Sequence, residues 1–322
     1  MEGTVVFPDR SNDTKRRVLV IGAAGLDIVG RPIGMPEPGT STPAKVRPSF
    51  GGVAHNIAVN LAHLGQPVSL MTLVGKDVFG QQLLAEITEA GVDVSACLET
   101  DEYNTASYLA VLTESGKLHF ALDDMRILSR LEPECLRQQF ELFKQSSLVF
   151  VDANLSPASL RTVFHLARRA RVPVCADATS KSLAKRLQPF ISRLTLLTAN
   201  MEEAAVLCEK PMAVEDRQEG ISAARHLINQ GAQIALVTMA EFGVCYATSE
   251  TSGHIPAIHT SIQDPTGAGD AQTATLIFGL MNDIPLDDAI RLGVSAASLT
   301  LRNPGTVYPE LSLERLYDEL VI

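Results

Sequence analysis

The sequence contains no tryptophan, and aromatic residues make up only 5% of it. Proteins that bind single-stranded nucleic acid stack its bases on exposed aromatic rings, so this scarcity argues against such a surface. Basic residues are also in the minority: 27 lysines and arginines face 37 acidic residues, for a formal net charge of -10. An acidic surface repels phosphodiester backbones and anionic membranes. We therefore expect no nucleic acid and no membrane as partner, and a highly anionic substrate would need a cation such as Mg²⁺.

Cysteine and long apolar runs are scarce too. The five cysteines form no Cys-x-x-Cys pair, which favours a reducing compartment over a disulfide framework. No segment approaches the roughly 18 consecutive apolar residues of a membrane helix. Residues 1–16 lack the apolar segment of a signal peptide. We expect a cytoplasmic protein with a flexible N-terminal tail at residues 1–16.

Apolar side chains are nevertheless plentiful, because 46% of the 322 residues are hydrophobic. Short apolar runs predict buried strands at residues 17–22, 68–74, 147–152, 172–177, 194–198 and 234–238. Between the later runs, apolar residues recur at helical spacing, which predicts helices there. The same spacing predicts helices at residues 53–64, 79–90, 267–281, 286–301 and 311–320. Such alternation of strand and helix is typical of a parallel sheet with helices on both faces.

Two segments interrupt this alternation. Residues 31–50 are rich in proline, which suits loops and edge strands but not helix interiors. Residues 106–112 and 117–122 alternate around the turn Glu114-Ser115-Gly116 and predict a β-hairpin. Together they predict a small antiparallel layer outside the main sheet. We expect one α/β domain over residues 17–322, with segments near 31–50 and 99–127 inserted, since neither can form a core alone.

The strongest local signal is the run Asp264-Pro-Thr-Gly-Ala-Gly-Asp270 at the start of a predicted helix. Its two glycines let backbone N–H groups turn toward one point, and the helix N-terminus adds positive charge there. Asp270 would lie beside an anion bound at this point and could accept a proton from an attacking hydroxyl, as phosphoryl transfer to an alcohol requires. A purely structural alternative is an N-cap at Thr266 followed by a favourable acidic residue in the first turn.

This run resembles the C-terminal signature of the ribokinase, or PfkB, family of carbohydrate and nucleoside kinases. The run Gly51-Gly52-Val53-Ala54-His55-Asn56 resembles the Gly-Gly-x-x-x-Asn signature of the same family, and Val74-Gly75-Lys76-Asp77 continues the likeness. The resemblance implies a ribokinase-like three-layer α/β/α sandwich with a mostly parallel central sheet and a small β-sheet lid. It also implies an ATP-dependent kinase that uses Mg²⁺.

For the transfer site, the resemblance implies a general base at Asp270. The backbone N–H groups of Gly267, Ala268 and Gly269 would bind the charge of the phosphoryl group. On the sugar side it implies contacts from Asp27, Gly51, Gly52 and Asn56. Asn56 has an alternative interpretation as a polar residue in the first turn of a helix.

For the nucleotide, the resemblance implies roles for Asn200 and Glu203, which match an Asn-x-x-Glu motif; Glu203 would hold Mg²⁺ through water. A capping box at the start of a helix explains the same two residues. The resemblance implies that the nucleotide is also contacted by Thr238, Gly243, Thr266, Gly267 and Gly269. The sequence departs from the family at Ala240, where glycine is usual, so we expect a differently shaped loop; Thr198-Ala199 replaces the usual Lys-Pro.

The inserted segments resemble those of pseudouridine kinases within the family, which implies phosphorylation of the 5′-hydroxyl of pseudouridine. Thr105, Met125 and Asn154 would contact the base; packing inside the lid is the alternative for Met125. The resemblance further implies a monovalent cation (K⁺) near Asp264 and a homodimer formed through the lid, with a small nucleoside or sugar as the substrate.

Some other functions stay open, and others are disfavoured. The protein could instead be another kinase of the family, similar to ribokinase, fructokinase or adenosine kinase. A non-catalytic nucleoside-binding regulator also stays open, and the departure at Ala240 would agree with it. A dehydrogenase is disfavoured because Gly22-Ala-Ala-Gly25 lacks the Gly-x-Gly-x-x-Gly spacing. A metal hydrolase is disfavoured because the seven histidines form no His-Glu-x-x-His motif.

Overall fold

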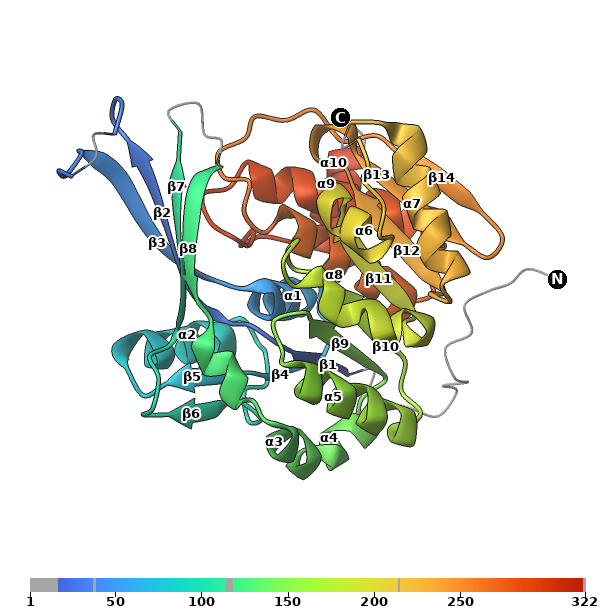
Figure 1. The fold of residues 1–322 in the computed structure, drawn as a ribbon, viewed down its shortest axis with the longest axis horizontal. Helices are drawn as coiled ribbons and strands as arrows, with labels where there is room; N and C mark the ends of the chain where they lie inside the picture. The colour runs from blue at the N-terminus through green and yellow to red at the C-terminus, as the bar shows by residue number, and fades with distance from the viewer. Residues whose placement is uncertain (1–16, 37–38, 114–117, 214, 321–322) are drawn as a thin grey trace.

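A computed structural model describes residues 17–36, 39–113, 118–213 and 215–320. Within these ranges the chain forms a central eight-stranded sheet covered by helices on both faces, with a four-stranded sheet beside it (Figure 1). The predicted three-layer α/β/α fold with a small separate sheet is confirmed. The expected tail at 1–16 and the turn Glu114-Ser115-Gly116 lie outside the described residues.

The central sheet has the strand order β14-β13-β12-β11-β10-β9-β1-β4. Its strands are β1 (Val18–Ile21), β4 (Val68–Met71), β9 (Leu148–Asp152), β10 (Val174–Asp177), β11 (Leu196–Asn200), β12 (Ile234–Thr238), β13 (Val244–Thr248) and β14 (Ser252–Ile255). The six strands from β12 to β4 run parallel, and β13 and β14 complete one edge in antiparallel pairs. This antiparallel edge was not predicted from the sequence.

Helices from distant parts of the chain cover each face of the sheet. One face carries α1 (Val53–His63), α2 (Val78–Glu89), α8 (Ala268–Met281), α9 (Leu286–Leu301) and α10 (Leu313–Leu320). The other carries α3 (Pro133–Gln138), α4 (Phe140–Lys144), α5 (Pro157–Ala170), η2 (Ala184–Arg193), α6 (Met201–Leu207) and α7 (Arg217–Asn229). Two further 3₁₀ turns are η1 (Arg126–Arg130) and η3 (Ala240–Phe242).

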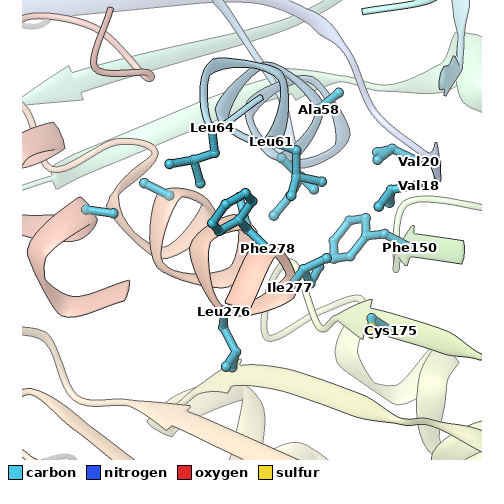
Figure 2. Packing of buried hydrophobic residues seen from close by; sticks show 14 of the residues in the cluster. Val18, Val20, Ala58, Leu61, Leu64, Phe150, Cys175, Leu276, Ile277 and Phe278 are labelled. Carbon is cyan, nitrogen blue, oxygen red and sulfur yellow. The ribbon is translucent and has the colours of Figure 1, made fainter. Parts of the chain in front are cut away.

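The core on the α8 face explains why α8 is apolar on all sides. Figure 2 shows Val18, Val20 and Phe150 of the sheet in one cluster with Leu61 of α1 and Ile277 of α8. Every residue of α8 from Ala271 to Met281 is buried, because the helix packs against the sheet, α1 and α9. A helix enclosed in this way cannot shift without breaking the core, so its first turn is a rigid platform.

The outer sheet has the strand order β3-β2-β7-β8. Its strands are β2 (Gly25–Pro32), β3 (Ala44–Gly51), β7 (Ala106–Leu112) and β8 (Leu118–Asp124). The prediction of an antiparallel layer is wrong for the central pair, since β2 and β7 run parallel. Gly25 makes this pairing possible, because a Cβ there would lie 2.3 Å from the Ala106 carbonyl oxygen.

The apolar run at 68–74 also divides, contrary to the prediction of one strand. β4 belongs to the central sheet, and β5 (Leu73–Gly75) pairs in parallel with β6 (Leu98–Thr100). The break falls at Thr72, whose hydroxyl donates to the Gly22 carbonyl at 2.7 Å. Among the described helices, none is both long and apolar enough to span a membrane.

Candidate active site

A cavity of about 1240 Å³ lies at the carboxyl ends of the parallel strands. Its floor comes from the residues that follow β1, β9, β10, β11 and β12, and the outer sheet contributes Asp27, Tyr108 and Ala110 to one wall. The first turn of α8 forms part of another wall. Open α/β sheets bind ligands at the carboxyl ends of their strands, so this is the candidate active site.

The first turn of α8 presents backbone donors to this cavity. Gly267 has a φ of 81° and is the N-cap of the helix, so Thr266, the alternative cap, is not. A Cβ on Gly267 would lie 1.9 Å from the Thr306 carbonyl oxygen, which restricts this position to glycine. No atom of the described residues lies within 4 Å of the position of a Cβ on Gly269, so space is open beside the unpaired N–H groups of the first turn. The arrangement is suited to an anion.

Asp270, in the same turn, is held by Asn56 from the first turn of α1. Asn56 Nδ2 donates to Asp270 Oδ2 at 2.7 Å. Burial raises the pKa of Asp270 well above its ordinary value, Asp177 and then Asp152 raise it further, and the Asn56 amide opposes them. A carboxyl with a raised pKa is a stronger base once ionised, as proton abstraction from a hydroxyl requires.

The orientation of Asn56 is itself fixed by His55. The two side chains meet through His55 Nδ1 and Asn56 Oδ1 at 2.9 Å. Because the Asn56 nitrogen already donates to Asp270, its oxygen accepts here and His55 Nδ1 carries the proton. Burial lowers the pKa of His55 to about 4, so the ring is neutral at neutral pH. His55 was not predicted as a site residue.

Asp27 lies on β2 and lines the cavity from the side of the outer sheet. Burial, with the nearby charge of Asp264, raises its pKa to about 7. Gly51 makes room for this carboxylate, since a Cβ on Gly51 would lie 2.1 Å from Asp27 Oδ2. Gly51 is absent from the cavity lining, so its contribution is the space that it leaves for Asp27. Gly52 does line the cavity and begins α1 with a φ of 97°.

Two further carboxylates end neighbouring strands, and the sequence analysis assigned them no role. Asp152 at the end of β9 is buried and accepts from the Ala23 and Asn154 amides, at 2.7 and 2.9 Å. Burial raises its pKa to about 6. Asp177 at the end of β10 lines the cavity and accepts from the Thr198 hydroxyl at 2.7 Å, and burial raises its pKa as well. An acidic residue at the end of each strand was the available signal.

Asn200 and Glu203 form the capping box that begins α6. The Asn200 side chain accepts from the Glu203 amide at 2.9 Å, and Glu203 oxygens accept from the backbone and side-chain nitrogens of Asn200, both at 2.8 Å. Both residues also line the cavity. Burial and the charge of Asp177 raise the pKa of Glu203 to about 8. The structural interpretation of this pair is therefore correct, and it leaves Glu203 facing the cavity.

The donor set around the cavity suits a divalent cation held through water. No three histidine, cysteine or acidic side chains among the described residues converge closely enough to ligate an ion directly. Asp177 and Glu203 nevertheless both line the cavity, and burial raises the pKa of both carboxyls, so a nearby cation would favour their ionised forms. Oxygen donors and a retained water shell are what Mg²⁺ prefers.

The loop after β12 keeps a backbone conformation typical of glycine in spite of its alanine. Ala240 has a φ of 49°, in the left-handed region. The alanine adopts this conformation at a cost of about 1 kcal/mol, and the expectation of a loop shaped differently from that of the family stays a prediction. Gly243 has a φ of 93° and lies against the Ile255 carbonyl, outside the cavity, whereas Thr238 lines it.

The structure brings together most of the predicted site residues. Those that line the cavity are Asp27, Gly52, Asn56, Met125, Asn154, Asn200, Glu203, Thr238, Thr266, Gly267, Gly269 and Asp270. Ala268 is the first residue of α8, adjacent to the lining glycines. Thr105 lies elsewhere: its hydroxyl accepts from the Gly75 amide at 3.0 Å and donates to Asp77 at 2.8 Å. It ties two loops together and does not reach the cavity.

Arg186 was also missed by the sequence prediction. Its Nη1 donates to the carbonyls of Ala153, Asn154 and Leu155, at 3.1, 2.9 and 3.1 Å. The guanidinium comes from η2 and lines the cavity, so it fixes the loop that carries Asn154. No local pattern could reveal it, because its partners are backbone atoms of a segment about 30 residues away.

The fold and the site define an α/β phosphotransferase with an alcohol acceptor: an anion-binding helix N-terminus, a basic carboxylate in its first turn and a cavity at the strand ends. Residues 15–312 match the model of the pfkB family of carbohydrate kinases, and the chain belongs to that family.

Three known proteins illustrate the relationship. The chain is 31% identical to the pseudouridine kinase of Escherichia coli (strain K12), over 93% of this chain and 95% of that protein. It is 27% identical to the guanosine-inosine kinase of Exiguobacterium acetylicum, over 88% of this chain and 93% of that one. Its fold matches that of Arabidopsis thaliana ribokinase complexed with ribose and ATP, with a TM-score of 0.82, 20% identity, and coverage of 96% and 100% of the two chains.

Proposed function

We propose that the protein is an ATP-dependent nucleoside kinase that phosphorylates the 5′-hydroxyl of pseudouridine. The observation that carries the proposal is the pairing of Asp270 with Asn56 at the first turn of α8. It places a basic carboxylate beside backbone N–H groups that can bind an anion, with Asp27 on another wall of the same cavity. Family membership and the 31% identity to a pseudouridine kinase support the same activity.

In this reaction Asp270 takes the proton of the acceptor hydroxyl as its oxygen attacks the γ-phosphorus of ATP. A new O–P bond forms, the bond from phosphorus to the β–γ bridging oxygen breaks, and ADP leaves with that electron pair. The N–H groups of Gly267, Ala268 and Gly269 bind the charge on the transferred phosphoryl group. Asp27 accepts hydrogen bonds from hydroxyls of the sugar, which sets the distance between acceptor and Asp270.

Asp177 and Glu203 are the residues that we propose to hold Mg²⁺, through water molecules and not by direct ligation. When bound, the ion neutralises charge on the phosphates of ATP. Asn200 and Thr238 are directly paired at the ends of β11 and β12, and both line the cavity with Thr266; these three residues would contact the nucleotide. The protein offers few cationic side chains to the phosphates, since those of the cavity lining within the described residues are Arg126, Lys181 and Arg186.

Pseudouridine is favoured over a free sugar by three further residues of the cavity lining. Met125, Asn154 and Tyr108 all line the cavity. They offer an apolar surface and an amide to a uracil-like base. The guanosine-inosine kinase among the relatives supports a nucleoside, whereas a free sugar would leave this apolar surface uncovered.

The partner that we propose is a second copy of the chain, bound through the outer sheet. Leu109 and Leu122 are directly paired neighbours on β7 and β8 and are 38% and 62% exposed. Residues alternate along β7, so they lie on the face opposite Ala110 of the cavity wall. Phe120 and Val46 are also exposed. A second outer sheet would cover this apolar face.

Sedimentation analysis should give a dimer for the wild type, and the double variant Leu109→Lys/Leu122→Lys should give a monomer. A monomeric wild type would refute the proposed dimer.

The test is release of ADP with pseudouridine, uridine, guanosine, adenosine, ribose and fructose as acceptors. We expect the highest kcat/KM with pseudouridine, and none with any acceptor for Asp270→Asn. A preference for ribose or fructose would refute pseudouridine as the substrate but would still agree with a kinase activity. Substrate-dependent ADP from none of them, with binding of a nucleoside retained, would favour a non-catalytic regulator.

A further inference from the structure

An ion pair links the outer sheet to the loop that precedes α8. Arg47 of β3 contacts the Asp264 carboxylate through Nη2 and Oδ2. The two residues are 217 positions apart in the sequence. The Asp264 side chain is only 2% exposed, whereas that of Arg47 is 40% exposed. The guanidinium therefore enters from the surface and covers a carboxylate that has almost no access to water.

Both oxygens of Asp264 are already engaged. Oδ2 contacts Arg47, and Oδ1 accepts from the Thr266 amide at 3.0 Å. The Asp264 amide in turn donates to the Leu301 carbonyl at 3.3 Å. The carboxylate thus fixes the turn from Asp264 to Thr266, one residue before the glycine that begins α8. A carboxylate this deeply buried requires a positive partner, because it has lost the solvation that water provides.

The family resemblance implies a monovalent cation near Asp264, and the side chains present do not fit one. A cation on this carboxylate would lie beside the guanidinium, and the like charges would repel each other at short range in a poorly solvated site. Arg47 Nε is buried without a hydrogen-bond partner among the described residues, so no acceptor at this nitrogen competes with Asp264.

We propose that the Arg47 guanidinium takes the place of a monovalent cation beside Asp264 and positions the loop that leads into the anion-binding turn of α8. This inference rests on the proposed kinase function for its effect on rate, though not for its effect on ion binding. Because Arg47 belongs to β3, the charge balance of this loop then depends on the position of the outer sheet. Arg47 is a positioning residue that acts through Asp264 and Thr266.

The first test uses the wild-type protein, with K⁺ compared against tetramethylammonium at equal ionic strength. We expect the thermal unfolding midpoint to be the same in both salts, and kcat to agree within about twofold. A K⁺-specific rise in the midpoint or in kcat would overturn the proposal. The unfolding measurement needs no turnover, so it still decides the matter if no acceptor yields ADP and the proposed function fails.

The second test removes the guanidinium. Arg47→Ala should become K⁺-dependent: K⁺ should raise its unfolding midpoint and recover part of a kcat reduced by about tenfold or more. Arg47→Lys keeps the charge and should remain K⁺-independent. Lys45→Ala, two positions away on the same strand, is exposed and should behave as the wild type. An Arg47→Ala protein with normal kcat and no K⁺ response would contradict the proposal.

A third comparison locates the response. In Arg47→Ala/Asp264→Asn the buried charge is gone, so the K⁺ effect on the unfolding midpoint should vanish; a response that persists would place the ion elsewhere and refute the assignment to Asp264. If Arg47→Ala does not fold, the wild-type and Arg47→Lys salt comparisons remain sufficient, since K⁺ dependence in either would refute the proposal.

Discussion

Asn56 Nδ2 lies 2.7 Å from Asp270 Oδ2, so the first turn of α1 holds the carboxylate in the first turn of α8. The two residues are 214 positions apart in the sequence. The amide stabilises the ionised carboxylate, whereas burial and the neighbouring acidic groups favour the protonated one. This contact therefore does two things: it sets the direction of the carboxylate, and it limits how far the Asp270 pKa rises.

Asp270→Asn should abolish catalysis and leave the fold intact. The amide has nearly the same shape and cannot accept the hydroxyl proton, so kcat should fall by at least about 10³-fold. The substitution also removes a charge that burial and Asp177 disfavour, so the unfolding midpoint should stay the same or rise. Coupled ADP assays and thermal melts check both expectations. A rate within about tenfold of the wild type would contradict the role of Asp270 as base.

The ligand-free protein should lose stability as pH rises from about 5 to about 8. Burial raises the pKa of Asp152 to about 6, of Asp27 to about 7 and of Glu203 to about 8. Carboxyls in the unfolded chain titrate at about pH 4, so the native state binds more protons than the unfolded state over this interval. Their favourable contribution is complete below about pH 4 and is lost as pH passes the native pKa values.

Denaturant midpoints measured across this interval test that sign. Asp27→Asn/Glu203→Gln should flatten the pH dependence, because both groups are then neutral at every pH. A wild-type midpoint that rises with pH would contradict this prediction, because it would show that the folded protein stabilises the ionised form of these carboxyls.

His55→Phe should lower activity through Asn56. The ring keeps the volume but removes the donor to Asn56 Oδ1, so the amide is free to turn away from Asp270. We expect kcat to fall by about tenfold with a smaller change in KM. The acid limb of the kcat–pH profile should move to higher pH, because Asp270 loses a hydrogen bond that lowers its pKa.

His63→Phe is the matched control, since His63 lies at the opposite end of the same helix. An effect of His55→Phe on stability alone, with an unchanged pH profile, would mean that His55 only fills space.

Gly51→Ala should weaken substrate binding. Its Cβ would lie 2.1 Å from Asp27 Oδ2, so the carboxylate must move from its position in the cavity. We expect KM for the nucleoside to rise by about tenfold or more. Gly30→Ala on β2 is the control, because the nearest atom to its Cβ is 3.9 Å away. Equal KM values for the two variants would argue against the assignment of Asp27 to the sugar.

Ala240→Gly should stabilise the protein by up to about 0.5 kcal/mol, since relief of about 1 kcal/mol of left-handed strain exceeds the entropy that glycine adds to the unfolded chain. The φ of 49° at Ala240 is the basis of this expectation. Urea unfolding at constant m-value measures it. A lower free energy of unfolding in the variant would indicate that the alanine methyl group makes a compensating contact.

Much of the main sheet could be predicted from local patterns. β1, β9, β11 and β12 coincide closely with apolar runs, because a strand covered on both faces needs apolar residues at every position. The start of α8 was also predictable, since two glycines beside an acidic residue favour a helix N-terminus. The antiparallel edge strands β13 and β14 escaped prediction, as did the parallel pairing of β2 with β7. Pairing partners depend on which strands meet in space.

The candidate site divides in the same way. Asp27, Asn56, Asn200 and Asp270 were predicted as separate residues from local motifs, and the structure places all four on one cavity. Thr105 was predicted for the same cavity, yet it pairs with Asp77. Asp177 and Arg186 received no role: the position of Asp177 at a strand end was its one local signal, and Arg186 binds backbone atoms of a distant segment, which no local pattern reveals.

The acidic composition and scarcity of aromatic residues already argued against nucleic acid and membrane partners, because net charge and side-chain type act without regard to folding. Local sequence likewise determined most of the buried parallel strands and the start of α8, since periodicity and helix-end signals act over a few residues. Only the tertiary structure decided which charges face each other. Asn56 reaches Asp270 and Arg47 reaches Asp264 across more than 200 residues. The pKa of a carboxylate depends on its burial and its neighbours, and both exist only once the chain has folded.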